Sequence, residues 1–482
     1  MSDHDEKPAR KKISLTPKAA GESPERKRKP TRWSPLQRDR SKVAAPAPAA
    51  DAAKPGPRPA AEGAPAKARG EKRPYAREAR EGRRATTEAA PRRRSTPPAP
   101  VQLHFFAPCP RGLETELAKE LTELGATDAA PGSAGVTFGG DITLAWKVNL
   151  WSRLAIRVLQ RVAEGNYRDE EDLYRVALKQ PWPDWFAVDK TIAVRTVAHN
   201  SALKSLNFVT LRIKDGVCDR FRQDLELRPD VDAREPQVPI LIYLDRDRFA
   251  LYLDLSGEPL NRRGYRVEPA PAPLNENLAA GLLKLSGWTP EQPLLDPMMG
   301  GGTILLEAAM MALNMAPGLK RHFAFEHLIS FDKVEWTRLR KDAQAGQKEP
   351  QALPIYGCDI DPRMVRAAGL NLKAAGLLDC VTLREGDVMA IPAPGEHGFI
   401  VSNPPYGVRL DSDATFYKAL GDALKQHFSG WSAWLISGDA EFAKNIGLSA
   451  NRRIPLYNGP LDCRLYEYRL VAGTMRGKKP PR

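Results

Sequence analysis

Residues 294–303 read Leu-Leu-Asp-Pro-Met-Met-Gly-Gly-Gly-Thr, and this stretch decides the fold. Leu294 and Leu295 are typical of the end of a buried strand. The three glycines predict a turn whose backbone can approach a ligand, because glycine has no Cβ. Thr303 is expected to be the N-cap of a helix over the apolar run 304–313. A strand, a glycine turn and a helix N-terminus indicate a nucleotide-type site in an open α/β sheet, although an ordinary tight turn has the same local pattern.

Three further apolar segments end in polar residues. These ends are Asp359-Ile360-Asp361 after 354–358, Asp387 after 381–386, and Asn403-Pro404-Pro405-Tyr406 after 398–402. Parallel strands bring their carboxyl ends to one edge of a sheet, so these groups are expected to line the edge where such sheets bind ligands. An acid at the tip of the second strand is suited to accept hydrogen bonds from ribose hydroxyls. Asp359 and Asp361 are both candidates, with Asp359 favoured.

Two motifs carry a family resemblance. Asp296-Pro297-x-x-Gly300-x-Gly302-Thr303 and Asn403-Pro404-Pro405-Tyr406 together resemble the S-adenosylmethionine-dependent methyltransferases that modify exocyclic amines of nucleobases. The resemblance covers about residues 270–470. Segments 261–266, 274–280 and 458–463 narrow it to the bacterial large-subunit rRNA guanine-N2 methyltransferases, which are THUMP-containing class I enzymes. Met299 and Gly301 depart from the Cys and Ser usual in that family, but a site built from backbone amides does not need those side chains.

The resemblance implies a Rossmann-like class I methyltransferase sheet over residues 266–475 and S-adenosylmethionine as the cofactor. It assigns cofactor binding to Asp296, Pro297, Gly300, Gly302, Thr303, Asp359, Asp361 and Asp387. Asp387 is expected to meet the adenine amino group of the cofactor, and its alternative role is that of a solvated acid at a strand end. The implied catalytic residues are Asn403, Pro404, Pro405 and Tyr406.

The chemistry of the acceptor explains the second motif. An exocyclic amine is a poor nucleophile because its lone pair is delocalised into the ring. The Asn403 side-chain oxygen and the Pro404 carbonyl could accept the two amine hydrogens and direct the lone pair toward the methyl group. The two prolines stiffen this turn, so catalysis is expected to come from positioning rather than from a covalent step. Tyr406 is expected to stack on the base once the base leaves the RNA stack.

An α+β region is predicted before the catalytic domain. Helical spacing predicts helices over 112–124, 142–159 and 208–221, and apolar alternation predicts strands at 191–197, 240–244 and 249–255, the last two as a hairpin. In order and position this region resembles a ferredoxin-like segment (103–165) followed by a THUMP RNA-binding domain (166–265). Beyond the second motif, a helix is expected over 414–428 and strands at 433–437 and 465–470. The chain then stops, so a single methyltransferase activity is expected.

Several basic residues are candidates for RNA contacts. Lys204, Arg212, Lys214 and Arg222 lie in the THUMP-like region, and Arg262, Arg263 and Arg266 lie in the connector between the two ordered parts. For the first group, a solvated helix face is the favoured interpretation, and RNA contact is the alternative. The connector arginines are expected to face a cleft through which RNA passes. Pro269, Pro271 and Pro273 are expected to stiffen this linker.

The first hundred residues differ in composition from the rest. They hold 26 Lys and Arg against 12 Asp and Glu, and the remaining residues hold 47 of each, so the entire net charge of +14 lies on this tail. High proline and low apolar content predict disorder over residues 1–100. The tail is expected either to hold RNA through its phosphates or to be a solubilising extension.

Composition also limits the function. Five scattered cysteines without a C-x-x-C pattern and seven histidines without ligand spacing predict a reduced cytoplasmic protein with no metal. No apolar run is long enough to predict a membrane span. The expected partner is 23S rRNA or a large-subunit assembly intermediate, bound by a monomer. The leading function is rRNA guanine-N2 methylation. The alternatives are adenine-N6 methylation of DNA, which uses the same type of acceptor, and a non-catalytic RNA-binding assembly factor.

Overall fold

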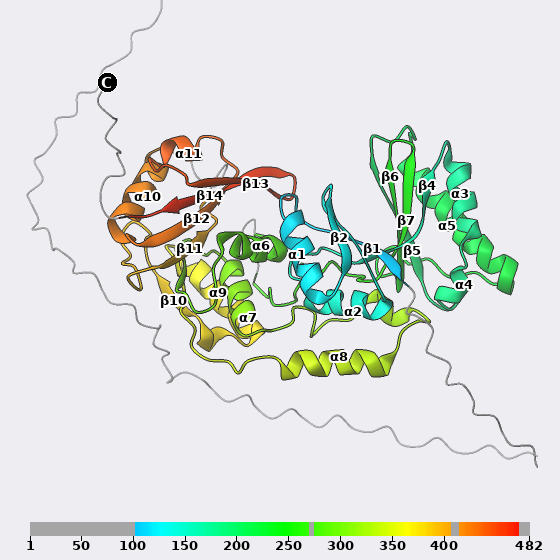
Figure 1. The fold of residues 1–482 in the computed structure, drawn as a ribbon, viewed down its shortest axis with the longest axis horizontal. Coiled ribbons are helices and arrows are strands. Elements are labelled where there is room, and N and C mark those ends of the chain that lie inside the picture. Colours follow the sequence, from blue (N-terminus) through cyan, green and yellow to red (C-terminus); the bar gives the residue numbers. More distant parts are fainter. Residues whose placement is uncertain (1–101, 269–273, 406–413, 472–482) are drawn as a thin grey trace, which may run out of the picture. The chain divides into compact units, whose positions relative to one another are not determined.

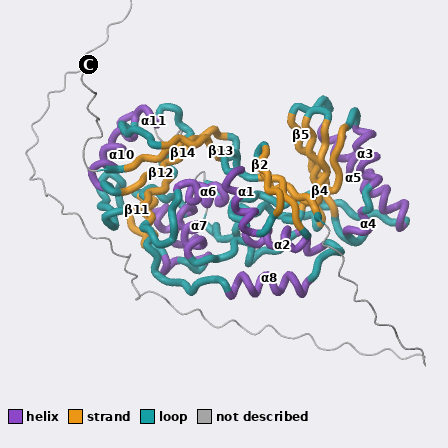
Figure 2. The backbone as a smooth tube through the Cα atoms, in the orientation of Figure 1, coloured by secondary structure: helices purple, strands orange, loops and turns teal. Residues whose placement is uncertain are grey.

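The computed structural model describes residues 102–268, 274–405 and 414–471 (Figure 1). Two seven-stranded sheets organise these residues, and Figure 2 shows their strands in orange among the purple helices. The predicted basic tail over residues 1–100 lies outside the described residues, as do Pro269, Pro271 and Pro273 of the linker.

The first sheet has the order β2-β3-β1-β4-β7-β6-β5. Only β5 and β6 pair in parallel; the other neighbours are antiparallel. In chain order its region comprises β1 (Leu103–Pro108), α1 (Glu114–Leu124), β2 (Thr127–Gly132), β3 (Gly135–Gly140), α2 (Ile142–Trp151), β4 (Leu159–Asn166), α3 (Glu170–Lys179), α4 (Trp182–Trp185), β5 (Ile192–His199), α5 (Leu206–Leu225), β6 (Val238–Asp245) and β7 (Arg248–Asp254). The predicted hairpin is β6–β7, whose register closes at the pair Asp245 and Arg248.

The helix predicted over 142–159 is shorter in the structure. α2 ends at Trp151, and Leu159 already belongs to β4. The buried carboxylate of Glu120 accepts hydrogen bonds from the Ser152 hydroxyl at 2.5 Å and from the backbone N–H of Arg153 at 3.0 Å. These bonds hold the chain in a turn after Trp151, so the apolar pattern beyond it does not continue the helix.

The second sheet has the order β10-β9-β8-β11-β12-β14-β13. Strands β8 to β12 are parallel, and β13 and β14 run antiparallel at the end of the sheet. Its region comprises α6 (Glu276–Ser286), β8 (Leu294–Asp296), α7 (Thr303–Ala312), η2 (Ala324–His327), α8 (Lys333–Ala345), β9 (Ile355–Asp359), α9 (Pro362–Ala375), η3 (Leu378–Cys380), β10 (Thr382–Glu385), β11 (Gly398–Ser402), α10 (Ala414–His427), β12 (Trp431–Ser437), α11 (Phe442–Asn445), β13 (Arg452–Asn458) and β14 (Leu461–Arg469).

Both faces of the second sheet are buried. Leu294 and Val401 belong to one hydrophobic cluster, whereas their chain neighbours Leu295 and Ile400 belong to the other. Successive side chains of a strand point to opposite faces, so the continuous apolar runs in the sequence reflect a sheet that is covered on both sides. The predicted Rossmann-like α/β fold with a preceding α+β region is confirmed.

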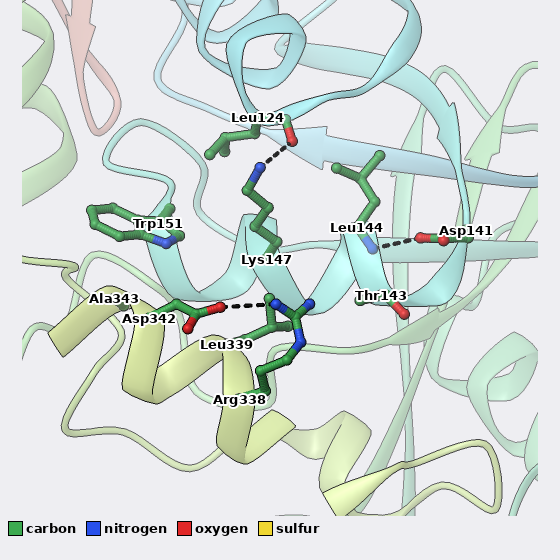
Figure 3. A pocket seen from close by; sticks show the side chains of 10 residues that line it. All are labelled: Leu124, Asp141, Thr143, Leu144, Lys147, Trp151, Arg338, Leu339, Asp342 and Ala343. Carbon is green, nitrogen blue, oxygen red and sulfur yellow. Dashed lines mark hydrogen bonds and ion pairs between the residues drawn. The ribbon is translucent and has the colours of Figure 1, made fainter. Parts of the chain in front are cut away.

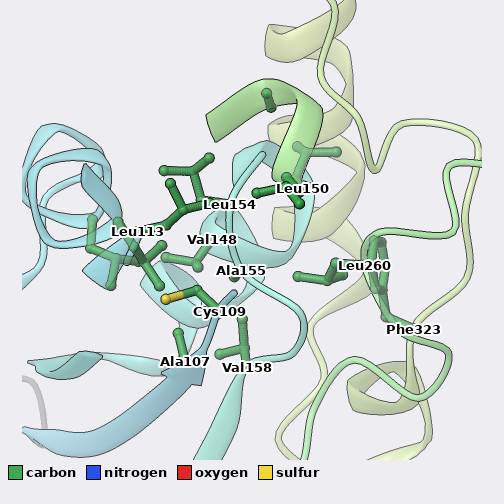
Figure 4. Close-up of a cluster of buried hydrophobic side chains, with 14 of the residues drawn as sticks. Ala107, Cys109, Leu113, Val148, Leu150, Leu154, Ala155, Val158, Leu260 and Phe323 are labelled. Carbon is green, nitrogen blue, oxygen red and sulfur yellow. The ribbon is translucent and has the colours of Figure 1, made fainter. Parts of the chain in front are cut away.

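The first of these clusters also joins the α+β region to the second sheet. Figure 4 shows Cys109, Leu113, Val148 and Leu154 packed together, with Leu260 of the connector close by. A Cβ added at Gly281 of α6 would lie 2.4 Å from a methyl carbon of Leu113, so glycine leaves room for the Leu113 side chain at this contact.

Arg263 lies inside this junction, and the prediction that it faces RNA is wrong. Its side chain is 1% exposed, and its guanidinium donates to the carbonyl oxygen of Arg153 at 2.6 Å and lies 3.4 Å from the carboxylate of Glu307. Tyr265 donates its hydroxyl to the same Glu307 oxygen at 2.9 Å. Breaking a buried charge pair of this kind by removing one partner costs about 3–5 kcal/mol, so Arg263 stabilises the junction.

No helix among the described residues is long and apolar enough to cross a membrane. Within the same residues, no group of three His, Cys, Asp or Glu side chains is placed to hold a metal ion. The five cysteines all lie within the described residues, where they are buried and form no disulfide.

Candidate active site

The glycine turn after β8 is open toward solvent at its centre. Gly300 has a φ of +51°, and a Cβ built there would have no neighbour within 4 Å. Gly302 has a φ of +80°, and its Cβ would lie 3.0 Å from that of Ala368. The left-handed conformation at both positions favours glycine. The turn therefore leaves space above Gly300 where a ligand could approach the backbone closely.

Thr303 does not have its predicted role as an N-cap. The N-cap of α7 is Gly302, and Thr303 is the first helical residue. The cap position needs the left-handed conformation found at Gly302, which is disfavoured for a threonine. The cap therefore falls one residue earlier than the sequence pattern suggests. Thr303 is buried, and its hydroxyl lies 3.4 Å from the guanidinium of Arg266.

The two acids after β9 differ in their contacts. Asp359 accepts the Gly300 N–H at 2.9 Å through one carboxylate oxygen and the Asp361 N–H at 3.0 Å through the other. Asp361 instead caps α9 by accepting the Arg363 N–H at 2.9 Å, and it forms an ion pair with the Arg363 side chain. Asp359 is thus tied to the glycine turn, whereas Asp361 is occupied by its own helix.

Asp296 lies beneath this turn and is only 1% exposed. One of its carboxylate oxygens accepts the Ser402 hydroxyl at 2.6 Å and the Met298 N–H at 3.3 Å. Burial raises the pKa of Asp296 to about 7. The link to Ser402 connects the tips of β8 and β11, so Asp296 positions the glycine turn and the residue that follows Ser402. Pro297 is also buried.

Asn403 follows β11 directly, and its side-chain oxygen is the feature of interest. Its Oδ1 atom is buried and accepts no hydrogen bond from the residues that the structure describes. Pro404 is buried and Pro405 is half-buried. Tyr406 lies outside the described residues. Asp387 is exposed beyond β10, and its carboxylate accepts the Met389 N–H at 3.0 Å. The register of the parallel strands places Asn403, Asp296, Asp359 and Asp387 at one edge of the sheet.

The remaining basic candidates divide into two groups. Lys204, Arg222 and Arg262 are largely exposed, although Arg222 pairs with Asp219 and Arg262 with Glu258. Arg212, Lys214 and Arg266 are less exposed and form ion pairs with Glu171, Asp215 and Glu276 respectively. Arg212, Lys214 and Arg222 all lie on α5, whereas Arg262 and Arg266 lie in the connector.

Sequence reasoning missed Ser402 and Glu120. Ser402 directly precedes the Asn-Pro-Pro motif, and a polar residue inside an otherwise apolar strand could have indicated a buried hydrogen bond. Glu120 gives no local signal, because its partners lie more than thirty residues away in the sequence.

A cavity of about 470 Å³ lies away from this edge of the sheet, between α2 and α8 (Figure 3). Its charged side chains bond with one another or with the backbone: Lys147 donates to the Leu124 carbonyl at 2.8 Å, and Arg338 pairs with Asp342 at 2.8 Å. Asp141 accepts the Leu144 N–H at 2.7 Å. These interactions engage the four charged side chains of the cavity within the protein itself.

The fold and the site define a class I methyltransferase architecture, and comparisons with known proteins agree. A family model described as RMKL-like, methyltransferase domain, matches residues 263–467. Models of the THUMP domain and of the RlmL ferredoxin-like domain match residues 167–254 and 104–159. The methyltransferase model covers nearly all of the second sheet, and the other two models cover the first sheet apart from most of β4.

Individual relatives cover most of the chain. It is 39% identical over 398 residues to "Ribosomal RNA large subunit methyltransferase K/L" of Aeromonas hydrophila, which covers 78% of this chain and 55% of that protein. It is also 39% identical over 370 residues to "Putative RNA methyltransferase slr0064" of Synechocystis, covering 76% of this chain and 96% of that protein. The chain thus spans about half the length of the K/L relatives that it matches.

Among solved structures, "SMU.472, a putative methyltransferase complexed with SAH" is 31% identical, with a TM-score of 0.71 over 77% of this chain and 99% of that one. A "predicted N6-adenine-specific DNA methylase" from Listeria monocytogenes is 30% identical, with a TM-score of 0.70 over 77% of this chain and 97% of that one. The chain belongs to the RMKL-like methyltransferases and carries their THUMP and ferredoxin-like domains.

Proposed function

We propose that this protein transfers a methyl group from S-adenosylmethionine to the exocyclic N2 amine of a guanine in 23S rRNA. The observation that carries this proposal is the buried Asn403 Oδ1 atom, which accepts no hydrogen bond from the described residues. A buried acceptor without a donor costs about 1–3 kcal/mol. Such an atom is understandable where a ligand supplies the missing N–H group.

Asn403 and Pro404 would orient the amine. The Asn403 Oδ1 atom and the Pro404 carbonyl oxygen would accept its two hydrogens, so that the nitrogen lone pair turns out of the plane of the base. S-adenosylmethionine, when bound, supplies an electrophilic methyl group on a sulfonium. Pro404 and Pro405 restrict the turn, and the acceptors are therefore preorganised before the base arrives. The surplus proton leaves the amine after the N–C bond has formed, and no general base is needed.

The glycine turn fits the cofactor. Gly300 leaves room for close approach, and its N–H holds Asp359 beside the turn at 2.9 Å. The second lone pairs of the Asp359 carboxylate oxygens remain available for ribose hydroxyls. We assign the ribose to Asp359 rather than Asp361, since Asp361 already caps α9 and pairs with Arg363. Asp387, exposed at the same edge, would meet the adenine amino group.

RNA as the substrate is supported by the THUMP match over 167–254 and by the names of the K/L relatives. A free 23S rRNA or a large-subunit assembly intermediate would both present the target. Lys204, Arg222 and Arg262 are the exposed candidates for RNA contacts, whereas Arg263 is excluded by its burial. The Asn403 acceptor alone does not separate guanine from adenine, because both bases carry an exocyclic amine.

The test is to methylate defined nucleic acids with the purified full-length protein and labelled S-adenosylmethionine. We expect label in 23S rRNA from a strain that lacks this gene, and nucleoside mass spectrometry should identify N2-methylguanosine. The same assay on double-stranded DNA should give no product. Recovery of N6-methyladenine, or of label in DNA alone, would contradict the proposal, and the Asn403→Ala protein serves as the inactive control.

A further inference from the structure

A second cavity, of about 460 Å³, is lined by residues from six separate segments of the chain, four of which carry its polar side chains. Arg111 comes from the loop before α1, Asn261 from the connector, Asn275 from the start of α6, and Tyr457 with Gly459 from the β13–β14 hairpin. None of Asn403, Asp359 or the glycines of the turn lines it. The cavity is therefore separate from the proposed methyl-transfer site.

The topology places this cavity at the ligand-binding edge of the second sheet. A short connection joins α6 to β8, so α6 runs antiparallel to the strand and begins at the carboxyl edge. β14 is antiparallel to β12 and pairs Arg464 with Ser437 at the carboxyl end of β12. The β13–β14 turn lies three residues beyond that pair, again at the same edge.

A close backbone contact brings the loop before α1 to the hairpin. Gly112 has a φ of +94°, and a Cβ there would lie 2.3 Å from the carbonyl oxygen of Pro455. Only glycine permits this approach, which brings Arg111 over the ring of Tyr457 with 5.5 Å between the guanidinium carbon and the ring centroid. The contact at Gly112 thus fixes the relative positions of Arg111 and Tyr457 on the wall of the cavity.

Four polar side chains of this cavity are not engaged elsewhere in the described part of the chain, whereas the Asn277 amide donates to the Leu154 carbonyl oxygen at 3.4 Å. Among the described residues, the side chains of Arg111, Asn261 and Asn275 and the hydroxyl of Tyr457 make no hydrogen bond or ion pair, and Asn275 occupies the N-cap of α6 without capping it. An asparagine that caps a helix with its side chain normally contributes about 0.5–2 kcal/mol to helix stability. The Asn275 side chain does not make this hydrogen bond, so its amide remains available to a ligand. The charged side chains of the cavity in Figure 3, by contrast, are all engaged.

We propose that this cavity binds one unstacked nucleotide of the RNA substrate, a neighbour of the nucleotide that is methylated. Its volume lies in the range of pockets for small organic ligands, about 300–1,000 Å³. Unstacked bases bind to RNA-binding proteins by stacking on aromatic rings and guanidinium planes and by hydrogen bonds along their edges. Tyr457 and Arg111 provide the planar groups, and Asn261 and Asn275 provide donors and acceptors.

The charge of the lining favours a nucleotide over other ligands. Arg111 is its one ionised side chain, and no carboxylate lines it, so the cavity attracts the phosphates on either side of a bound base. This proposal rests on the proposed function, because it takes RNA as the substrate. It adds a binding site for a second nucleotide.

Three variants of the full-length protein test this. Tyr457→Ala and Arg111→Gln should each weaken binding of a 23S rRNA fragment by about 10-fold or more, because stacking or charge is lost. Tyr457→Phe keeps the ring and should bind within about 2-fold of wild type. Arg338→Gln, at the other cavity, is the matched charge control and should not change RNA affinity. Cofactor affinity, measured by calorimetry, should stay the same in all four. Unchanged RNA affinity in Arg111→Gln, which alters an exposed side chain and should not affect folding, would overturn the proposal.

A photo-cross-linking amino acid at position 457 locates the bound nucleotide. We expect a cross-link to a nucleotide other than the methylated one, and a cross-link to the methylated base itself would overturn the proposal. The two proposals fail separately. If wild type methylates RNA but the variants bind it normally, only the cavity assignment is wrong. If wild type methylates no RNA yet the variants still lose RNA affinity, the cavity assignment stands and the proposed function is wrong.

Discussion

At the scale of single residues, the proposed chemistry depends on the Asn403 side-chain oxygen. Asn403→Ala removes one of two acceptors for the amine but leaves the glycine turn and Asp359 in place. We expect turnover to fall by about 10²-fold or more, as for loss of one preorganised hydrogen-bonding group at a reaction centre. Single-turnover methylation at saturating cofactor measures this, and cofactor affinity should change by only a few-fold. A near-normal single-turnover rate would show that the oxygen does not orient the amine.

Asp296 gives a second prediction at this scale, on pH and stability. Burial raises the pKa of Asp296 to about 7 from an ordinary value of 3.8, so the folded protein holds the proton more tightly than the unfolded chain does. The stabilisation is full below the unfolded pKa and is lost as pH rises through about 7. The asparagine in the Asp296→Asn protein cannot ionise, so that protein does not lose stability through this group as the pH rises.

We therefore expect the stability of wild type, relative to the Asp296→Asn protein, to fall by about 2–3 kcal/mol between pH 5 and pH 8. Urea unfolding of both proteins at several pH values within this range measures the difference. A difference that stays constant over this range would show that Asp296 titrates as an ordinary carboxylate, in conflict with its burial.

At the scale of elements, Asp359 at the end of β9 is expected to serve cofactor binding, whereas Asp361 at the start of α9 is expected to serve helix stability. Asp359→Ala should weaken cofactor binding by 10-fold or more, because it removes both the expected ribose acceptor and the carboxylate bonded to Gly300. Asp361→Ala should instead lower stability by about 0.5–2 kcal/mol through loss of a helix cap. Calorimetric titration with S-adenosylhomocysteine and thermal unfolding of both variants distinguish these effects. If Asp361→Ala weakens cofactor binding while Asp359→Ala does not, the ribose assignment is reversed.

Elements were predictable where periodicity was strong. Apolar alternation indicated the β6–β7 hairpin, and the four polar strand ends around Asp359 and Asn403 indicated the edge of the second sheet. β2, with the sequence Thr-Asp-Ala-Ala-Pro-Gly, and β13, which contains Pro455, gave no such signal. Both are edge strands, which tolerate proline and have only one neighbour, so their pairing is set by β3 and β14 rather than by their own pattern.

At the scale of the whole molecule, long-range partners limit what sequence can indicate. Arg262, Arg263 and Arg266 form one basic cluster in the sequence, yet they occupy three environments. Arg262 is exposed, Arg266 pairs with Glu276, and Arg263 is buried against Glu307, 44 residues later in the chain. Nothing within the local sequence reveals Glu307 as a partner. For the same reason, the convergence of six separate segments on the second cavity emerges only from the fold.

The last prediction follows from the charge distribution: the tail supplies RNA affinity, and the rest of the chain supplies specificity. The first hundred residues carry the whole net charge of +14, and the other 382 hold 47 basic and 47 acidic groups. Each phosphate that a cationic side chain neutralises steepens the salt dependence of binding, by about 0.7 per contact on single strands. Such contacts carry no base specificity. Deleting residues 1–100 should therefore flatten the plot of log affinity against log salt and slow association at low salt, without changing the methylated nucleotide.

Titration of full-length and truncated protein with one rRNA fragment at several salt concentrations measures both slopes. A third protein keeps the full-length tail but has its Lys and Arg residues replaced by Gln. This variant distinguishes the effect of tail charge from the effect of tail length. If charge is what matters, the neutralised tail should behave like the deletion, because only counterion release contributes to the slope. Equal slopes in all three proteins would show that the tail makes no phosphate contacts and acts as an extension only. A shift of the methylated nucleotide would show instead that the tail helps to select the target, a role that phosphate contacts alone cannot provide.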